Sequence, residues 1–272
     1  IYVKDEKKSD QKAVVKYIDK TDGNKLLESD ETVGKSGEKI NYSTDSKIKE
    51  LTDKGYVLVK DGFPKDGIFD DNDKEDQIFE VILEHGVAPV GPNDPHEPGT
   101  PINPMDPEGP KWLDKDNYSK EYTSTIHYVD EKGNTVSVDN VQTSVWGRTL
   151  QVDKVTGEIL NPDEAWVSDK QNYDEVKTPT VNGYYADKVK VPSKAVEQQN
   201  LTETVVYKPL GKVVPVDPEG NLIPGAETPI YTNDPKDPTK GGETPIPEIP
   251  GYRPEIPGQT TVVPKDPGKD TP

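Results

Sequence analysis

The stretch that decides the fold is Val14-Val15-Lys16-Tyr17-Ile18-Asp19, which runs directly into Lys20 and then Thr21-Asp22-Gly23. Alternating side chains that are rich in β-branched and aromatic residues are typical of a half-buried strand. An Asp-Gly pair after such a strand favours a tight hairpin turn. We therefore predict a hairpin made of residues 13–18 and 25–33.

The elements after this hairpin continue in a recognisable order. Ser43 or Thr44 can cap a short helix whose Ile48 and Leu51 lie three residues apart, and Gly55 suits the position just past its end. Residues 56–60 and 77–83 have the alternation of two more strands. Hairpin, helix, hairpin is the order of the β-grasp (ubiquitin-like) fold, which we predict for this first part of the chain.

The opening pattern recurs twice. Residues 125–130 read Thr-Ile-His-Tyr-Val-Asp before a turn at Gly133, and residues 213–217 read Val-Val-Pro-Val-Asp before a turn at Gly220. Each copy of this strand-and-turn pattern is followed later in the chain by a Gly-Tyr pair, at Gly55-Tyr56, Gly183-Tyr184 and Gly251-Tyr252. The chain therefore contains internal repeats.

Proline divides the chain into four segments. It occupies every third position at residues 89, 92, 95, 98, 101, 104, 107 and 110, which matches the three residues per turn of a polyproline II helix. We expect residues 1–88 to form the β-grasp-like domain, 89–110 a polyproline-type linker, 111–209 a β-rich domain and 210–272 a proline-rich extended tail or third partial repeat. The expected fold class is mainly β or α+β, with two small β-rich domains in an elongated arrangement.

Composition excludes several functions. The 272 residues carry 51 Asp+Glu against 33 Lys+Arg, a net charge of −18, so neither a nucleic acid nor an anionic membrane surface is an expected partner. No apolar run is long enough for a transmembrane helix. The chain has no Cys, which removes disulfides and thiol chemistry. It starts at Ile1, and we expect a piece of a longer polypeptide.

The turn motifs resemble those of the mucus-binding (Mub/MucBP) repeat family. The resemblance lies in Asn182-Gly183-Tyr184, in Val205-Val206-Tyr207, in residues 153–158 leading to Trp166, and in the tail from Val216 to Tyr252. It covers most of residues 111–260 and is weaker over 1–88, where the turn is one residue longer. The family consists of repetitive cell-surface adhesins of lactic acid bacteria. The resemblance implies an extracellular repeat that binds mucin glycoproteins, is monomeric within a multi-repeat chain, and is anchored to the cell wall through its parent protein.

A chain of this charge gains no long-range attraction to anionic mucin glycans, so binding must rest on hydrogen bonds, aromatic stacking or cation bridges at short range. The candidate ligand-binding residues are Trp112, Tyr118, Tyr184, Tyr185, Tyr231 and Tyr252. For each of them, packing inside a small β domain is the competing interpretation. Two other functions stay open: a host immunoglobulin-binding module, and a structural spacer that projects other binding domains.

The acidic loop of residues 70–76 suggests calcium. Its carboxylates repel one another, and Asp71, Asp73 and Glu75 alternate so that a turn could direct them at one hard cation. The loop lacks the glycine and the final bidentate Glu of an EF-hand, and a solvated acidic loop is the competing interpretation. No cofactor is required by the sequence, and Ca²⁺ is the one candidate ion.

Catalytic signals are weak. The sequence has no Gly-rich phosphate loop, no Gly-x-Ser-x-Gly and no His-Glu-x-x-His motif, and it contains only 3 His. A carboxylate pair for glycoside hydrolysis needs a cleft in a larger fold than these domains offer. We expect a protein that is not an enzyme. A Lys–Asn cross-link could stabilise the thin core without cysteine, but no motif singles out a pair.

Overall fold

The computed structural model describes residue 2 and residues 8–272. The chain is mainly β, with 41% of residues in strands and 5% in helices, which confirms the predicted class. It forms two compact units. Unit 1 combines Ile1–Lys120 with Gly147–Val167, and unit 2 combines Glu121–Trp146 with Ser168–Pro272. Each unit is therefore built from two separate stretches of chain, and the four-segment division expected from proline does not match them.

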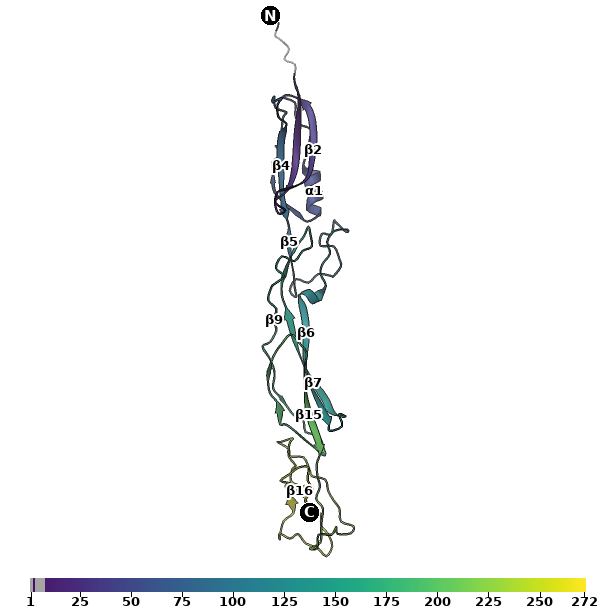
Figure 1. Cartoon of the computed structure of the whole chain (residues 1–272). Helices are drawn as coiled ribbons and strands as arrows, with labels where there is room; N and C mark the ends of the chain where they lie inside the picture. Colours follow the sequence, from purple (N-terminus) through teal and green to yellow (C-terminus); the bar gives the residue numbers. More distant parts are fainter. Residues whose placement is uncertain (1, 3–7) are drawn as a thin grey trace. The chain divides into compact units, whose positions relative to one another are not determined.

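Unit 1 opens with a four-stranded sheet in the order β2-β1-β4-β3. The hairpin of β1 and β2 turns at Asp22 and Gly23, as predicted, and the central pair β1 and β4 is parallel. Figure 1 shows β2 and β4 with the helix α1 beside them. The elements are β1 (Asp10–Asp19), β2 (Lys25–Lys35), α1 (Asp45–Asp53), β3 (Tyr56–Asp61) and β4 (Gln77–His85). The hairpin, helix, hairpin order is confirmed, and the assignment to the β-grasp fold stays a prediction.

The core of this sheet lies between β1, β4 and the helix. Leu51 of α1 packs with Val15 and Tyr17 of β1 and with Val81 and Leu83 of β4. The helix begins after Thr44, as expected, but the Thr44 hydroxyl donates to Asp61 at 2.6 Å and caps nothing. Gly55 follows the helix with φ +100°, a conformation that favours glycine.

The proline-rich segment 89–110 is folded, and the prediction of an extended linker for it is wrong. Strand β5 (Val87–Val90) includes Pro89 and pairs with β8 (Leu150–Asp153), and the 3-10 helix η1 (Lys115–Asn117) follows the prolines. Backbone hydrogen bonds join Ile102 to Pro110 and Trp112 to Thr100. A second core of unit 1 forms from Val90, Ile102, Tyr118, Leu150 and Val152. The periodic prolines thus lie in successive turns here, and the buried side chains of Val90 and Ile102 hold the segment in the core.

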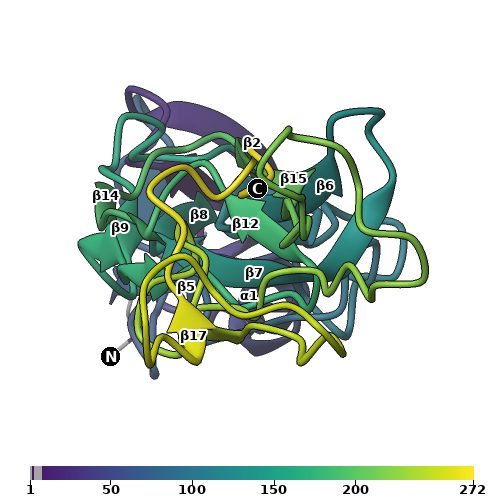
Figure 2. The same ribbon diagram turned by 90° about the horizontal axis from the view of Figure 1, so that it is seen from below.

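Unit 2 is built on a five-stranded sheet in the order β12-β15-β6-β7-β9. Strands β15 and β6 are parallel neighbours, and Figure 2 shows them with β12 beside β15. The core packs Ile126 and Tyr128 of β6 against Val205 and Tyr207 of β15. The sheet strands are β6 (Ser119–Asp130), β7 (Thr135–Gly147), β9 (Val167–Ser168), β12 (Tyr184–Ala186) and β15 (Leu201–Pro209). Two-stranded pieces complete the unit: β10 (Asn172–Tyr173) with β14 (Lys194–Ala195), β11 (Val176–Lys177) with β13 (Lys190–Val191), and β16 (Thr244–Pro245) with β17 (Thr261–Val262).

The tail 210–272 also folds, which corrects the expectation of an extended tail. Leu210, Val213 and Tyr231 form a small core of their own. The side-chain amide of Asn233 donates to the carbonyls of Val181, at 3.0 Å, and Tyr184, at 2.7 Å. These bonds hold the tail on the strands of unit 2, because they satisfy backbone carbonyls next to β12.

Candidate functional site

Two of the six aromatic candidates are core residues. Tyr118 and Tyr231 each expose only 2% of their surface. The Tyr231 hydroxyl makes its hydrogen bonds within the protein, since it lies 2.7 Å from the carbonyl of Lys269 and 2.6 Å from the hydroxyl of Thr271. The prediction that these two rings contact a ligand is therefore not supported, because neither ring reaches the surface.

Three further candidates are partly buried by neighbours. Trp112 packs on the second core of unit 1, and its ring stacks on His96 with 3.6 Å between centroids and 3° between planes. Tyr184 packs on the core of unit 2, and Tyr185 packs on the core of the tail. Local packing accounts for each of these rings.

Tyr252 is the candidate that the structure leaves available. Its side chain is 52% exposed, and it lines an open hollow in unit 2. The rest of the lining comes from residues 223–227 and 247–250, which supply apolar prolines and the carboxylates of Glu227 and Glu248. An exposed ring beside hydrogen-bond acceptors can hold a ligand that has one apolar face and several hydroxyl groups.

The acidic loop lines a second hollow, at the edge of the first sheet of unit 1. Its lining consists of Asp10, Gln11, Lys12, Val33 and residues 72–76. Asp73 accepts from the amide of Gln11, and Asp76 forms an ion pair with Lys12 at 3.0 Å. Within residue 2 and residues 8–272, no three His, Asp or Glu side chains gather as a metal ion requires. Calcium at Asp71, Asp73 and Glu75 therefore stays a prediction from the sequence.

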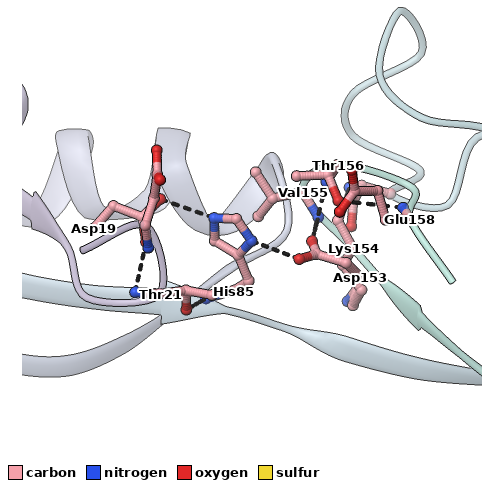
Figure 3. Close-up of polar contacts among 10 residues, drawn as sticks. Asp19, Thr21, His85, Asp153, Lys154, Val155, Thr156 and Glu158 are labelled. Atoms are coloured by element: carbon pink, nitrogen blue, oxygen red, sulfur yellow. Dashed lines mark hydrogen bonds and ion pairs between the residues drawn. The ribbon is translucent and has the colours of Figure 1, made fainter. Parts of the chain in front are cut away.

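The most strongly constrained polar cluster is one that the sequence did not reveal. His85, at the end of β4, lies between two buried aspartates (Figure 3). Its Nε2 is 2.8 Å from Oδ2 of Asp19, and its Nδ1 is 2.6 Å from Oδ2 of Asp153. The side chains of His85, Asp19 and Asp153 expose 9%, 3% and 7% of their surface. The cluster joins β1, β4 and the end of β8 inside unit 1.

Each aspartate of the cluster also closes a turn with its other oxygen. Oδ1 of Asp19 accepts the backbone amides of Thr21 and Asp22, and Oδ1 of Asp153 accepts those of Val155 and Thr156. The sequence carries a signal for this pairing, because residues 19–23 and 153–157 share the pattern Asp-Lys-x-x-Gly. The pattern predicts two similar turns but does not say that one histidine joins them.

Burial and hydrogen bonding act in opposite directions on this cluster. Burial alone lowers the pKa of His85, but the bonds to Asp153 and Asp19 outweigh it and leave the pKa raised above the ordinary 6.5. Burial alone raises the pKa of Asp153, but His85 and the turn amides outweigh it and leave that pKa below 3.8. Both shifts favour the charged forms.

Models of two protein families match the chain. The model described as a mucin binding domain matches residues 11–85, and the model described as a Muc B2-like domain matches residues 113–211. No curated protein matches. In the described part of the chain, no helix has the length and apolar character to cross a membrane.

Solved structures of mucus-binding repeats are similar to the chain. The crystal structure of Mub-RV is 29% identical, with 72% of this chain and 97% of that chain covered and a TM-score of 0.54. The type 2 repeat of the mucus binding protein MUB from Lactobacillus reuteri is 31% identical over 73% of this chain and 99% of that chain, with a TM-score of 0.48. The mucin-binding domain of Spr1345 from Streptococcus pneumoniae is 30% identical over 34% of this chain and 92% of that chain, with a TM-score of 0.29. The chain belongs to the mucus-binding (Mub) repeat family.

Proposed function

We propose that the chain is an extracellular adhesin repeat that binds the glycans of mucins and has no enzymatic activity. Its membership of the mucus-binding repeat family supports adhesion to mucus. The parent protein would hold the repeat at the bacterial surface through the cell wall. Several repeats in one parent chain would turn weak single contacts into strong attachment by raising the effective concentration of binding sites.

The observation that carries the glycan proposal is the half-exposed ring of Tyr252 at the rim of its hollow. With a net charge of −18, the chain has no long-range attraction to sialylated or sulfated glycans. The binding energy must then come from contacts at short range. The apolar face of a sugar can stack on Tyr252, and its hydroxyls can donate to Glu227 and Glu248, so neutral sugar residues fit this hollow best.

The test compares the whole chain with four variants on immobilised mucin, before and after enzymatic deglycosylation. We expect Tyr252→Ala to weaken binding about 3- to 10-fold, the effect of losing roughly 0.5–1.5 kcal/mol of aromatic contact. Tyr252→Phe keeps the ring and should retain most of the affinity. Ile256→Ala is the matched control, since Ile256 is 63% exposed and does not line the hollow.

The outcomes separate the function from its location. Equal binding to deglycosylated mucin would contradict glycan recognition, and no binding to mucin would favour the spacer. If Tyr252→Ala binds normally but Asn72→Ala/Lys74→Ala does not, the glycan site lies in the hollow at the acidic loop, within the residues that match the mucin binding domain.

A host immunoglobulin is the second candidate ligand, and one observation favours it. Strand β3 is an edge strand, and three successive apolar residues on it, Val57, Leu58 and Val59, are 48%, 39% and 45% exposed. Such an edge can accept a strand from another protein. If it does, proline substitutions along β3 should abolish immunoglobulin binding, while alanine substitutions should largely preserve it. An immunoglobulin sample in the mucin assay tests this directly.

A further inference from the structure

The cluster of Asp19, His85 and Asp153 has no role in the proposed binding of glycans, and its geometry restricts the protonation state of the histidine. Both ring nitrogens of His85 face carboxylate oxygens, at 2.8 Å and 2.6 Å. A carboxylate oxygen only accepts hydrogen bonds, so each nitrogen must donate one. An imidazole donates from both nitrogens only when it is protonated. Between two ionised aspartates, this geometry therefore specifies a positively charged His85.

Loss of one proton would change the contact from attraction to repulsion. A neutral imidazole keeps one N–H and carries a lone pair on its other nitrogen, which would then face a buried carboxylate. Because all three side chains are at least nine-tenths buried, water cannot readily replace the lost hydrogen bond. The contact is thus stable in one protonation state of the histidine.

In the part of the chain that the structure describes, no lysine or arginine forms an ion pair with Asp19 or Asp153. Among the ion pairs of residue 2 and residues 8–272, Asp19 and Asp153 have His85 as their charged partner. The Tyr56 ring lies edge-on to the His85 ring at 5.4 Å, and burial raises the pKa of its hydroxyl, so it stays neutral. Asp22 adds negative charge in the turn after Asp19. Of the neighbouring lysines, Lys20 pairs with Glu84, and the side-chain stem of Lys154 lies beside Gly86.

Hydrogen bonds beside the cluster connect the same two parts of unit 1. The amide of Lys154 donates to the carbonyl of Gly86 at 2.8 Å, and the amide of Gly86 donates to the carbonyl of Gly55 at 2.9 Å. The Asn103 side-chain amide donates to the carbonyl of Lys154 at 2.7 Å. These bonds connect the turn after β8 to the end of the first sheet. Hydrogen exchange at their amides therefore reports whether the turn stays attached to the sheet.

We propose that His85 is a proton-dependent latch that fastens the turn of residues 153–157 to the first sheet of unit 1. Protonated His85 holds both Asp19 and Asp153, and deprotonated His85 releases one of them. The sign follows from the two shifts. A raised histidine pKa makes the stabilisation complete below 6.5 and removes it as the pH rises through the shifted value. A lowered aspartate pKa makes it complete above 3.8 and removes it as the pH falls through the shifted value. The latch is therefore closed between about pH 3.8 and 6.5 and opens as the pH rises through the raised pKa of His85.

The direct test is nuclear magnetic resonance on the full chain, labelled with ¹⁵N in its histidines. We expect both ring nitrogens of His85 to be protonated at pH 6, and its titration midpoint to lie above 6.5. His127, which meets Asp139 through one nitrogen at 2.8 Å and is 42% exposed, is the matched internal control. A His85 that carries a single ring proton at pH 6, or that titrates below 6.5, would overturn the proposal.

The second test asks whether the proton controls the latch. Hydrogen exchange at the amides of Gly86 and Lys154, corrected for the intrinsic effect of pH, should accelerate at least about tenfold as His85 deprotonates, while the β1 and β4 amides stay protected. The variant His85→Gln should show fast exchange at these two amides at every pH, and His127→Gln should behave like the unmodified chain. If the two amides exchange at one corrected rate across the titration of His85, the histidine is not a latch. The titration uses the unmodified chain, so it decides the question even if His85→Gln does not fold.

Discussion

Two pairs of aspartate turns differ in what the second carboxylate oxygen meets. In the turns at Asp19 and Asp153, one oxygen accepts two backbone amides and the other meets His85. In the turns at Asp130 and Asp217, one oxygen also accepts two backbone amides. The other accepts the side-chain amide of Asn134, at 2.9 Å, or Asn221, at 3.3 Å.

The difference separates two kinds of turn. The turns at Asp19 and Asp153 meet at His85 and form a buried joint, whereas the turns at Asp130 and Asp217 lie at the surface. A neutral amide from the same turn completes the hydrogen bonds locally, and the turn can stand at the surface. A charged imidazole from a distant strand completes them at long range, so the turn must be buried against that strand. We therefore expect substitutions at the Asp19 and Asp153 turns to affect all of unit 1. The equivalent changes at Asp130 and Asp217 should stay local.

The largest expected effect comes from adding a methyl group at the joint. An alanine Cβ at Gly55 would lie 2.5 Å from the carbonyl oxygen of Lys154, and the backbone there has φ +100°. We expect Gly55→Ala to destabilise unit 1 by about 3 kcal/mol, from overpacking and from backbone strain together. Gly133→Ala is the control, because Gly133 has φ +84° but open space around its Cβ position. Denaturant-dependent hydrogen exchange, read from peptides of each unit, measures both; equal losses would refute the close contact.

The next effect comes from removing one charge of the joint. Asp153→Asn keeps the shape of the side chain but removes the charge that His85 requires. We expect a loss of about 2 kcal/mol in the free energy of unfolding of unit 1, the usual range for a hydrogen bond to a charged group. Asp217→Asn makes the same change at a surface turn and should cost clearly less. Chemical unfolding of both variants checks the comparison, and similar losses would mean that burial at His85 does not matter.

A double-mutant cycle sharpens the same comparison. Because Asp19 and Asp153 share one cation, the combination of Asp19→Asn and Asp153→Asn should cost less than the sum of the single changes, by about 1 kcal/mol. Asp130→Asn and Asp217→Asn share no hydrogen-bond partner, and their effects should add. Additive behaviour at the joint would show that His85 does not couple its two aspartates.

The smallest expected effect comes from a surface ion-pair cluster of unit 2 in acid. Hydrogen bonds from Lys194 and Lys188 lower the pKa of Glu203 to about 2. This lowered value makes the stabilisation complete above pH 4.5 and removes it as the pH falls toward 2. Glu203→Gln should flatten this acid dependence in unit 2 by less than about 1 kcal/mol, since these pairs lie near the surface. The loss of stability as the pH rises through the raised pKa of His85 should stay in unit 1. Unfolding measured from pH 2 to pH 9 tests both ends.

Local patterns in the sequence predicted much of the first sheet. The Asp22-Gly23 turn, the helix before Gly55 and the strands on either side all depend on neighbours in sequence, and all are present. The proline segment was misinterpreted because its period of three is the same for an extended helix and for a series of turns. Whether the segment forms an extended helix or a series of turns depends on the burial of Ile102 with Leu150 in one core. That contact joins residues far apart in the chain.

The candidate site was predictable only in part. The sequence named Tyr252 but could not separate it from Tyr118 and Tyr231, since exposure depends on what other segments cover. His85 gave no signal of its own, because one histidine after a strand is ordinary. The environment of the His85 ring is set by Asp19 and Asp153, which lie 66 and 68 residues away in the sequence.

The pairing of β5 with β8 has a consequence for the order in which the molecule is made. Residues 87–90 leave the ribosome long before residues 150–153 with which they pair, and the same delay separates His85 from Asp153. The first sheet has all of its strands by His85, whereas the rest of unit 1 must wait for a partner segment that follows β6 and β7. During synthesis and export, unit 1 is therefore completed by a late-arriving strand, and its assembly is slower than local hairpin formation. A chain interrupted before Asp153 would carry a sheet whose histidine has found only one of its two aspartates.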